Sequence, residues 1–140
     1  RERVGAGASF GEWMSRYARK KDASHGGVVD AFEALGCSVA VVECATKGCF
    51  DVVVGCAGRD HAVEVKPTKA QAGRADRTRL RDSQSKFHAA WKGARIPVVH
   101  DAKEVAELVN LWRLEAANAD RAAQLLKREM DETLAKVTYG

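Results

Sequence analysis

The sequence predicts an α/β domain, with a small mixed β-sheet flanked by helices and a long C-terminal helical extension. Two valine-rich segments, residues 50–56 and 61–66, are separated by a turn at residues 57–60, which predicts a β-hairpin. Apolar residues at helical spacing precede and follow this hairpin, so helices are expected to cover the sheet. With 140 residues, the chain can bury one hydrophobic core.

Three regions are expected along the chain. Residues 1–21 form a basic segment with Arg16, Arg19, Lys20 and Lys21, residues 22–112 form the core, and residues 113–140 form the helical extension. In the first region, apolar side chains recur at i, i+3, i+4 and i+7, which predicts a short helix docked on the core. These side chains are Phe10, Trp13, Met14 and Tyr17.

The core is expected to begin with a helix and a strand. Asp22 or Ser24 caps the helix, and Gly36 ends it. Its apolar face consists of Val28, Val29, Phe32 and Leu35. Residues 37–44 are rich in valine and predict a buried strand that leads toward the hairpin.

The region after the hairpin is predicted to contain a loop, a helix and a strand. Pro67 ends the second hairpin strand because proline has no N–H to donate, and residues 68–81 then form a polar, basic, mobile loop with no core residue before Leu80. Asp82 or Ser83 caps a helix that stops at Gly93. Residues 96–100 form a fourth strand, placed at a sheet edge because it contains proline.

The C-terminal part is predicted to be helical from a cap at Asp101 onward. Its apolar residues recur in alternating steps of four and three, which is a heptad-like pattern. This seam either packs back on the domain or pairs with a second copy in a homodimer. Its members are Val105, Val109, Trp112, Ala116, Ala119, Ala123, Leu126, Met130 and Val137.

The positive charge is concentrated in a few segments. The formal net charge is +4, but residues 66–81 hold six cationic side chains and one acid, Asp76. Such a segment suits a polyanion such as a nucleic-acid backbone, although solvated loops of this composition are common. The six are Lys66, Lys69, Arg74, Arg77, Arg79 and Arg81.

Other compositional features argue for a cytoplasmic protein without a membrane partner. No apolar run is long enough to span a bilayer, and the first residues do not resemble a signal peptide. The cysteines at positions 37, 44, 49 and 56 form no CxxC pair, so reduced thiols near the core are favoured over a zinc site.

Asp51, Glu64 and Lys66 are the candidate catalytic residues. Side chains two apart on a strand share a face, so Glu64 and Lys66 point to the same side. If the hairpin closes at residues 58–59, Asp51 lies opposite Lys66, and all three side chains converge. A register shift of one residue would destroy this convergence.

These residue types suit metal-dependent hydrolysis of a phosphodiester. Magnesium takes hard oxygen ligands and retains several waters, so the two carboxylates and the carbonyl of Val65 would suffice, with manganese also accepted. A bound metal lowers the pKa of water and neutralises charge on the phosphate, while Lys66 positions the nucleophile.

The stretch from residue 22 to residue 108 resembles the PD-(D/E)xK nucleases, in particular the small phage-type branch near the VRR-NUC and Holliday-junction resolvase-like families. The matching pieces include residues 22–29, Gly48-Cys49-Phe50-Asp51 and Val63-Glu64-Val65-Lys66. After the basic loop, Gln84, Phe87-His88, Trp91-Lys92-Gly93 and residues 97–99 continue the match. The resemblance implies a restriction-endonuclease-like core and magnesium-dependent DNA cleavage, with Gln84 near the scissile phosphate.

The chain departs from the family pattern at two positions. Phe50 stands where proline is typical, and His25 stands where many relatives carry a metal-binding glutamate. His25 is either a ligand of the metal or phosphate, or a helix-start residue without a catalytic role.

Other residues near the expected site also have two interpretations. Gln84 either acts at the phosphate or caps its helix, and His88 either reaches the phosphate or packs against the core. Phe87 and Trp91 are expected to be core residues rather than base-stacking platforms. Nucleic-acid backbone contacts are expected from Lys69, Arg74, Arg77, Arg79 and Arg81.

The sequence thus favours a magnesium-dependent endodeoxyribonuclease of phage or prophage origin, acting in a bacterial host in replication, recombination or repair. Junction resolution and structure-selective nicking are both compatible with it. The alternatives are a non-catalytic nucleic-acid-binding module on the same fold and a cysteine-based metal or redox protein, which the cysteine spacing supports little.

Overall fold

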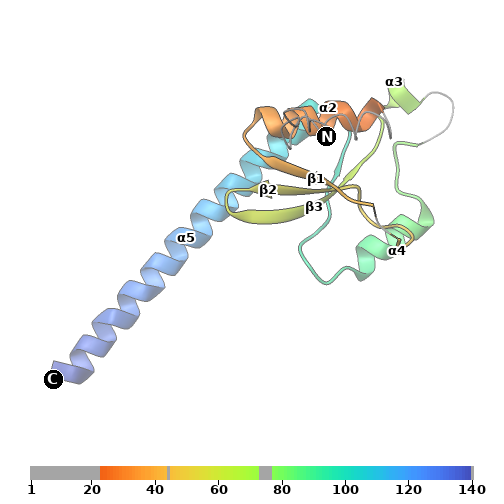
Figure 1. Ribbon diagram of the computed structural model, residues 1–140. Helices are drawn as coiled ribbons and strands as arrows, with labels where there is room; N and C mark the ends of the chain where they lie inside the picture. The colour runs from red at the N-terminus through yellow and green to blue at the C-terminus, as the bar shows by residue number, and fades with distance from the viewer. Residues whose placement is uncertain (1–22, 44, 73–76, 140) are drawn as a thin grey trace, which may run out of the picture.

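The computed structural model describes residues 23–43, 45–72 and 77–139 (Figure 1). The predicted N-terminal helix with Phe10, Trp13, Met14 and Tyr17, the basic cluster before residue 22, and Arg74 lie outside these residues. The described part is a mixed α/β fold, as predicted. Its elements are α2 (Ala23–Ala34), β1 (Ser38–Val41), β2 (Val52–Cys56), β3 (Arg59–Val65), α3 (Lys69–Ala72), α4 (Asp82–Ala90), β4 (Val98–Val99) and α5 (Ala102–Tyr139).

The four strands form one mixed sheet in the order β1-β2-β3-β4. The first three strands are antiparallel, and β4 runs parallel to β3, with Glu64 paired to Val98. The predicted edge position of the fourth strand is therefore confirmed. Because parallel neighbours need a crossover, the chain between β3 and β4 returns across the sheet and carries α3 and α4.

The β2–β3 hairpin closes at Ala57 and Gly58, one residue earlier than predicted. Both residues have positive φ, 52° and 77°, as a two-residue type I′ turn requires. Val52 pairs with Val63, so continuing this register places Asp51 opposite Glu64 rather than opposite Lys66. The predicted register was therefore wrong by two residues. A shift of two preserves the faces of both strands, so the candidate side chains still converge.

The hydrophobic core lies between one face of the sheet and the helices α2 and α5 (Figure 1). Phe32 of α2 stacks on Trp112 of α5, with ring centroids 5.9 Å apart and an interplanar angle of 10°. Gly36, at φ 83°, takes the left-handed conformation that ends α2. The buried side chains at the centre of this core are Val28, Val29, Val52, Val54, Val63, Val65, Val105 and Val109.

The connection between β3 and β4 differs from the prediction in two respects. Residues 69–72 form the short helix α3, whose Ala72 is buried, so this part is not the coreless loop that was expected. Helix α4 contains no buried residue, Phe87 is half-buried, and Trp91 is exposed. The expectation that Phe87 and Trp91 belong to the core is therefore wrong, because α4 lies apart from α2 and α5 (Figure 1).

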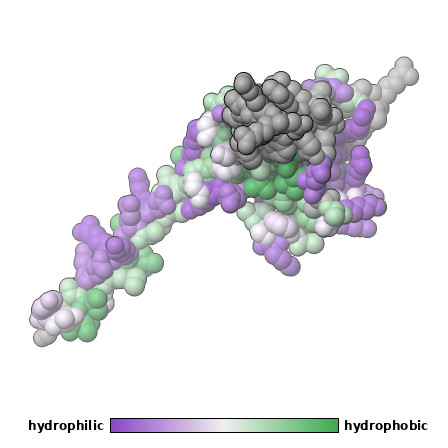
Figure 2. Space-filling model, in the orientation of Figure 1, coloured by the Kyte–Doolittle hydropathy of each residue, from purple (hydrophilic) through white to green (hydrophobic). Residues whose placement is uncertain are grey.

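Helix α5 is continuous over 38 residues. It begins as predicted, with Asp101 Oδ1 accepting a hydrogen bond from the Glu104 amide at 2.9 Å. Ala116 is its last buried residue, and the remainder projects from the domain by about 35 Å at the helical rise per residue (Figure 1). Figure 2 shows apolar side chains along one edge of this projection and hydrophilic side chains along the other.

The cysteines confirm the expected thiols in part. Cys37 and Cys56 are free and buried, and burial together with the neighbouring Cys56 thiol raises the pKa of Cys37 to about 11. Cys49 is disulfide-bonded, so the expectation of a reduced thiol is wrong at this position. Within the part of the chain that the structure describes, no helix is both long and apolar enough to cross a membrane.

Candidate active site

Asp51, Glu64 and Lys66 meet at one end of the β2–β3 hairpin. Asp51 directly precedes β2, while Glu64 and Lys66 lie at the end of β3, and antiparallel pairing brings these ends together. The Val65 amide donates a hydrogen bond to Asp51 Oδ2 at 2.9 Å, and Lys66 Nζ lies 3.3 Å from Glu64 Oε1. The predicted convergence of these side chains is therefore present.

Glu64 is the most deeply buried acid of the site. Its exposed fraction is 1%, and its Oε1 accepts a hydrogen bond from Gln84 Nε2 at 2.6 Å. Burial, reinforced by the Asp51 carboxylate, raises the pKa of Glu64 to about 7, although Lys66 acts in the opposite direction. Glu64 Oε2 is buried and has no hydrogen-bond partner. An unsatisfied buried carboxylate oxygen is costly and needs an explanation, such as a cation that it would bind.

Gln84 joins helix α4 to the catalytic candidates. Its Oε1 accepts hydrogen bonds from Lys66 Nζ at 2.8 Å and from the Arg81 amide at 2.9 Å, while its Nε2 donates to Glu64. Gln84 thus caps its helix, as one of the two interpretations expected, and the same side chain contacts Glu64 and Lys66. The N-cap of α4 is Arg81, so the predicted caps Asp82 and Ser83 were wrong.

A close backbone contact holds the segment before β2 against α4. Gly48 has φ 84°, and a Cβ atom added there would lie 2.4 Å from the Ser83 carbonyl oxygen. Only glycine fits this contact, which fixes Asp51 relative to Gln84. A hollow of about 330 Å³ opens beside it and is lined by Lys47, Phe50, Asp51, Arg81 and Gln84, among others. The sequence analysis placed Gly48 in a motif but did not identify this steric role.

His25 extends from the first turn of α2 to the same site. Its Nε2 lies 3.7 Å from Asp51 Oδ2, within ion-pair distance, and its side chain is largely buried. The structure therefore brings His25 to the carboxylate that was predicted to bind metal. His25 thus lies both near the start of its helix and next to Asp51.

His88 lies one turn beyond Gln84 on α4. Its Nε2 is buried without a hydrogen-bond partner. Burial and the positive charge of Lys66 lower the pKa of His88, partly opposed by Asp51, so the neutral ring is favoured. The charges of Lys66 and Asp51 thus both act on His88. The His88 side chain is half-buried and is not part of the core.

The predicted nucleic-acid contacts lie on the connection that leaves the site. Lys69 is exposed on α3, and Arg77, Arg79 and Arg81 are exposed just before α4. Thr78 within this segment is held by His100, whose Nε2 lies 2.9 Å from the Thr78 carbonyl oxygen.

His100 thereby ties the basic segment to the end of β4, a contact that the sequence analysis missed. Its Nδ1 lies 2.9 Å from Glu104 Oε2. Burial alone lowers the pKa of His100, but Thr78, Glu104 and Asp101 together raise it above the usual value. A protonated ring can donate from both nitrogens at once. No local pattern marks this contact, because its partner Thr78 lies 22 residues earlier in the chain.

The donor set for a metal is small. Within residues 23–43, 45–72 and 77–139, no group of three or more His, Cys, Asp or Glu side chains could hold a metal ion. Magnesium nevertheless binds through one or two carboxylates and keeps several waters. Asp51, Glu64 and the Val65 carbonyl fit this requirement, and the unpartnered Glu64 Oε2 is the observation that supports the fit.

Comparisons with protein-family models, with curated proteins and with solved structures found no match. The functional interpretation of this mixed α/β fold therefore depends on the geometry and electrostatics of the site.

Proposed function

We propose that this chain is a magnesium-dependent DNA endonuclease with a PD-(D/E)xK site on a restriction-endonuclease-like core. The supporting observation is the arrangement around Glu64, a buried carboxylate with one free oxygen beside Asp51, Lys66 and Gln84. This arrangement pairs a cation-binding group with a lysine on one face of a hairpin. The proposed reaction is hydrolysis of a phosphodiester, in which water attacks phosphorus and one P–O bond breaks.

Asp51, Glu64 and the carbonyl of Val65 would hold the metal, either magnesium or manganese. The Val65 amide points toward Asp51, and the N–H and C=O groups of one strand residue lie on the same edge, so its carbonyl faces this site too. His25, beside Asp51, would add a further ligand or contact the phosphate. When bound, the metal supplies positive charge that lowers the pKa of water and neutralises the phosphate.

Lys66 and Gln84 would act on the nucleophile and the phosphate. Lys66 is only 8% exposed, and Gln84 Oε1 holds its ammonium group at 2.8 Å. A lysine fixed in this way can orient an attacking water and stabilise negative charge that develops on the phosphoryl oxygens. Gln84 is neutral, so it positions Lys66 without cancelling its charge. The DNA around this centre would be contacted by His88 and by five cations, which are Lys69, Arg74, Arg77, Arg79 and Arg81.

A non-catalytic nucleic-acid-binding module explains the site less well. The raised pKa of Glu64 means that its ionised form is disfavoured in the folded, metal-free protein. A protein that only binds DNA gains nothing from a buried acid at this position, because its ionised form would repel phosphate. Metal-dependent cleavage gives these costly groups a function.

We also propose that the projecting part of α5 pairs two copies of the chain. Its exposed apolar residues continue the spacing of the buried Val105, Val109, Trp112 and Ala116, so one stripe runs from the core into solvent. Paired helices would bury the stripe and hold two active sites at a fixed separation. Its large exposed members include Leu126, Met130, Leu134 and Val137.

Dimerisation can be tested by ending the chain after residue 118, beyond the last buried position of α5. The truncated protein should remain folded and become monomeric in sedimentation, whereas the full chain should sediment as a dimer. A monomeric full chain would refute the pairing.

The activity can be tested with labelled linear duplex, flap and four-way-junction DNA in magnesium, manganese or EDTA. Metal-dependent cutting by the wild type, lost in Lys66→Ala, supports the proposal, and the preferred substrate separates junction resolution from nicking in replication or repair. DNA binding without cutting under every metal condition would replace the nuclease proposal with the binding-module alternative.

Cleavage at paired positions of the junction would connect activity to the dimer. The phage or prophage origin and the cytoplasmic location remain part of the same proposal.

A further inference from the structure

Trp91 is exposed although two aromatic neighbours contact its ring. Its exposed fraction is 42%, whereas that of the buried Trp112 is 6%. The indole stacks on Phe87 with centroids 5.6 Å apart at 26° and meets Phe50 edge-on at 5.7 Å. Gly93 gives it space, because a Cβ there would lie 2.6 Å from Trp91 Nε1. The outer part of this ring is thus presented to solvent in a fixed orientation.

The aromatic cluster of Phe50, Phe87 and Trp91 is attached to the candidate active site at two points. Phe50 directly precedes Asp51, and Phe87 lies one helical turn after Gln84. The 330 Å³ hollow is lined by Phe50 as well as by Asp51 and Gln84, so one member of the cluster borders the same hollow as Asp51. A nucleotide beside the phosphate at Asp51 would therefore be within reach of the cluster.

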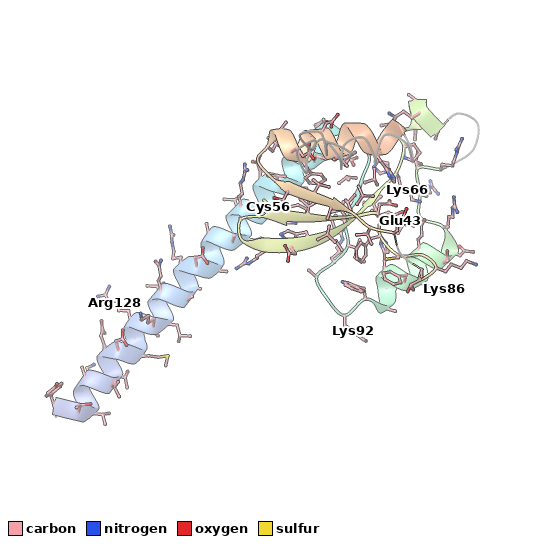
Figure 3. The ribbon with its side chains drawn as sticks, in the orientation of Figure 1. Glu43, Cys56, Lys66, Lys86, Lys92 and Arg128 are labelled. Atoms are coloured by element: carbon pink, nitrogen blue, oxygen red, sulfur yellow. The ribbon has the colours of Figure 1, made fainter. Side chains whose placement is uncertain are left out.

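The segment that carries Phe87 and Trp91 is strongly cationic. The described residues 77–95 hold six Lys or Arg side chains and a single acid, Asp82. Figure 3 shows Lys86 on α4 and Lys92 on the chain that follows it. An exposed aromatic ring among cations matches a single-stranded nucleic acid, whose backbone is anionic and whose bases have apolar faces. The cations are Arg77, Arg79, Arg81, Lys86, Lys92 and Arg95.

We propose that Trp91 is a stacking platform for an unpaired base of the nucleic acid bound at the active site. This inference rests on the proposed function and specifies its substrate class, which is DNA with a single-stranded segment next to the cleaved phosphodiester. Bases within a continuous duplex are stacked on each other and do not offer a free face to Trp91. A protein partner is less favoured, because the charges around this single ring suit a polyanion rather than an apolar interface.

The test is binding in EDTA, where cleavage does not occur, with a fluorescein-labelled oligothymidine and a blunt duplex of equal length. Removing one base–aromatic stack weakens binding by about 10-fold or more. Trp91→Ala is therefore expected to weaken oligothymidine binding by this factor and to leave duplex binding within about twofold, while Trp91→Phe keeps much of the affinity. Tyr139→Ala is the matched control, since Tyr139 is an exposed aromatic residue far along α5. It should bind both probes like the wild type.

Tryptophan fluorescence gives a second readout that does not depend on the stability of Trp91→Ala. Oligothymidine should quench the emission of the wild type, and Trp91→Phe should lose most of this quenching. Gly93→Ala should weaken binding as well, because the added methyl group displaces the indole. The proposal that Trp91 stacks on a base would be overturned if Trp91→Ala lost equal affinity for the single strand and the duplex. It would also be overturned if the quenching persisted in Trp91→Phe.

This experiment separates the two proposals. Selective loss of single-strand binding in a protein that never cuts DNA would support the platform and refute the nuclease. Metal-dependent cutting by the wild type, together with unchanged oligothymidine binding in Trp91→Ala, would support the nuclease and refute the stacking platform.

Discussion

Gln84 Oε1 accepts a hydrogen bond from Lys66 Nζ at 2.8 Å. The same amide group donates to Glu64 at 2.6 Å, so one neutral side chain holds both the lysine and the acid. This link matters because α4 contains no buried residue that could dock it on the core. The helix is held by Gln84, by the aromatic contacts of Phe50 and by the close approach at Gly48.

Gln84→Ala is expected to reduce the single-turnover rate of DNA cleavage by about 10- to 100-fold, the usual effect of removing a group that orients an active-site residue. The reason is that Lys66 would lose the acceptor that fixes its ammonium group. Gln71→Ala is the control, because Gln71 accepts a hydrogen bond from the Thr68 amide in a similar helix-start arrangement away from Glu64. Equal rates in both variants would show that Gln84 is only a cap.

Glu64→Gln is expected to stabilise the metal-free protein and to abolish its response to magnesium. The pKa of Glu64 is raised from 4.5 to about 7, so its ionisation costs stability as the pH rises through this range, and the full cost persists above it. Glutamine stays neutral, and the variant should therefore gain about 1–2 kcal/mol at pH 8 and little near pH 4.5.

Thermal unfolding in EDTA and then in magnesium measures both effects of Glu64→Gln. The wild type should gain stability from magnesium, and the variant should not. A variant that is less stable than the wild type at pH 8, or equally stabilised by magnesium, would argue against a metal at Glu64.

The sequence predicted the parts of this fold that depend on local periodicity. The apolar face of α2, the two hairpin strands and the Asp101 cap follow from spacing and capping chemistry, and all are present. The faces of the hairpin were also predicted correctly, which is why Asp51, Glu64 and Lys66 were recognised as one group.

The features that sequence reasoning missed depend on tertiary contacts. The register was wrong because Ala57 adopts a positive φ, which a non-glycine residue takes only in special turns. Trp91 was assigned to the core because helical spacing does not show that α4 stands apart from α2 and α5. The contact of His100 with Thr78 joins residues far apart in the chain and has no local signature.

Replacing Ala57 by glycine should stabilise the protein. Its φ of 52° strains a residue with a Cβ atom, whereas glycine adopts this conformation freely. We expect a gain of about 0.5–1 kcal/mol in the free energy of unfolding, measured by urea denaturation. Gly58→Ala, at φ 77°, is the opposite control and should lose a similar amount. A destabilised Ala57→Gly would mean that the turn is not type I′ in solution.

His100 is expected to make stability depend on pH around neutrality. Its raised pKa means that the folded state favours the protonated ring, so this contribution is complete below about pH 6.5 and is lost as the pH rises through the folded-state pKa. Glu104 and Asp101 are the acids that face it. The stability difference between wild type and His100→Gln should be about 0.5 kcal/mol at pH 6 and shrink by pH 8.5.

Hydrogen exchange of the amides in residues 77–81 provides a local readout for His100. Protection of this segment should fall in His100→Gln, because the Thr78 carbonyl loses its contact with the His100 ring. If the stability difference between wild type and His100→Gln grew as the pH rose, it would contradict the raised pKa of His100.

The most direct test of the proposed nuclease is the single-turnover cleavage rate of wild type, Lys66→Met and Lys136→Met with excess protein and saturating magnesium. Both substitutions remove one lysine charge and keep an unbranched apolar side chain, but Lys66 is buried beside Glu64 while Lys136 is exposed in the last turn of α5. We predict cutting by the wild type and by Lys136→Met within about threefold of each other, and a loss of at least about 100-fold in Lys66→Met. Equal cleavage by all three proteins, or none by any of them, would contradict the assignment of Asp51, Glu64 and Lys66 as a nuclease site.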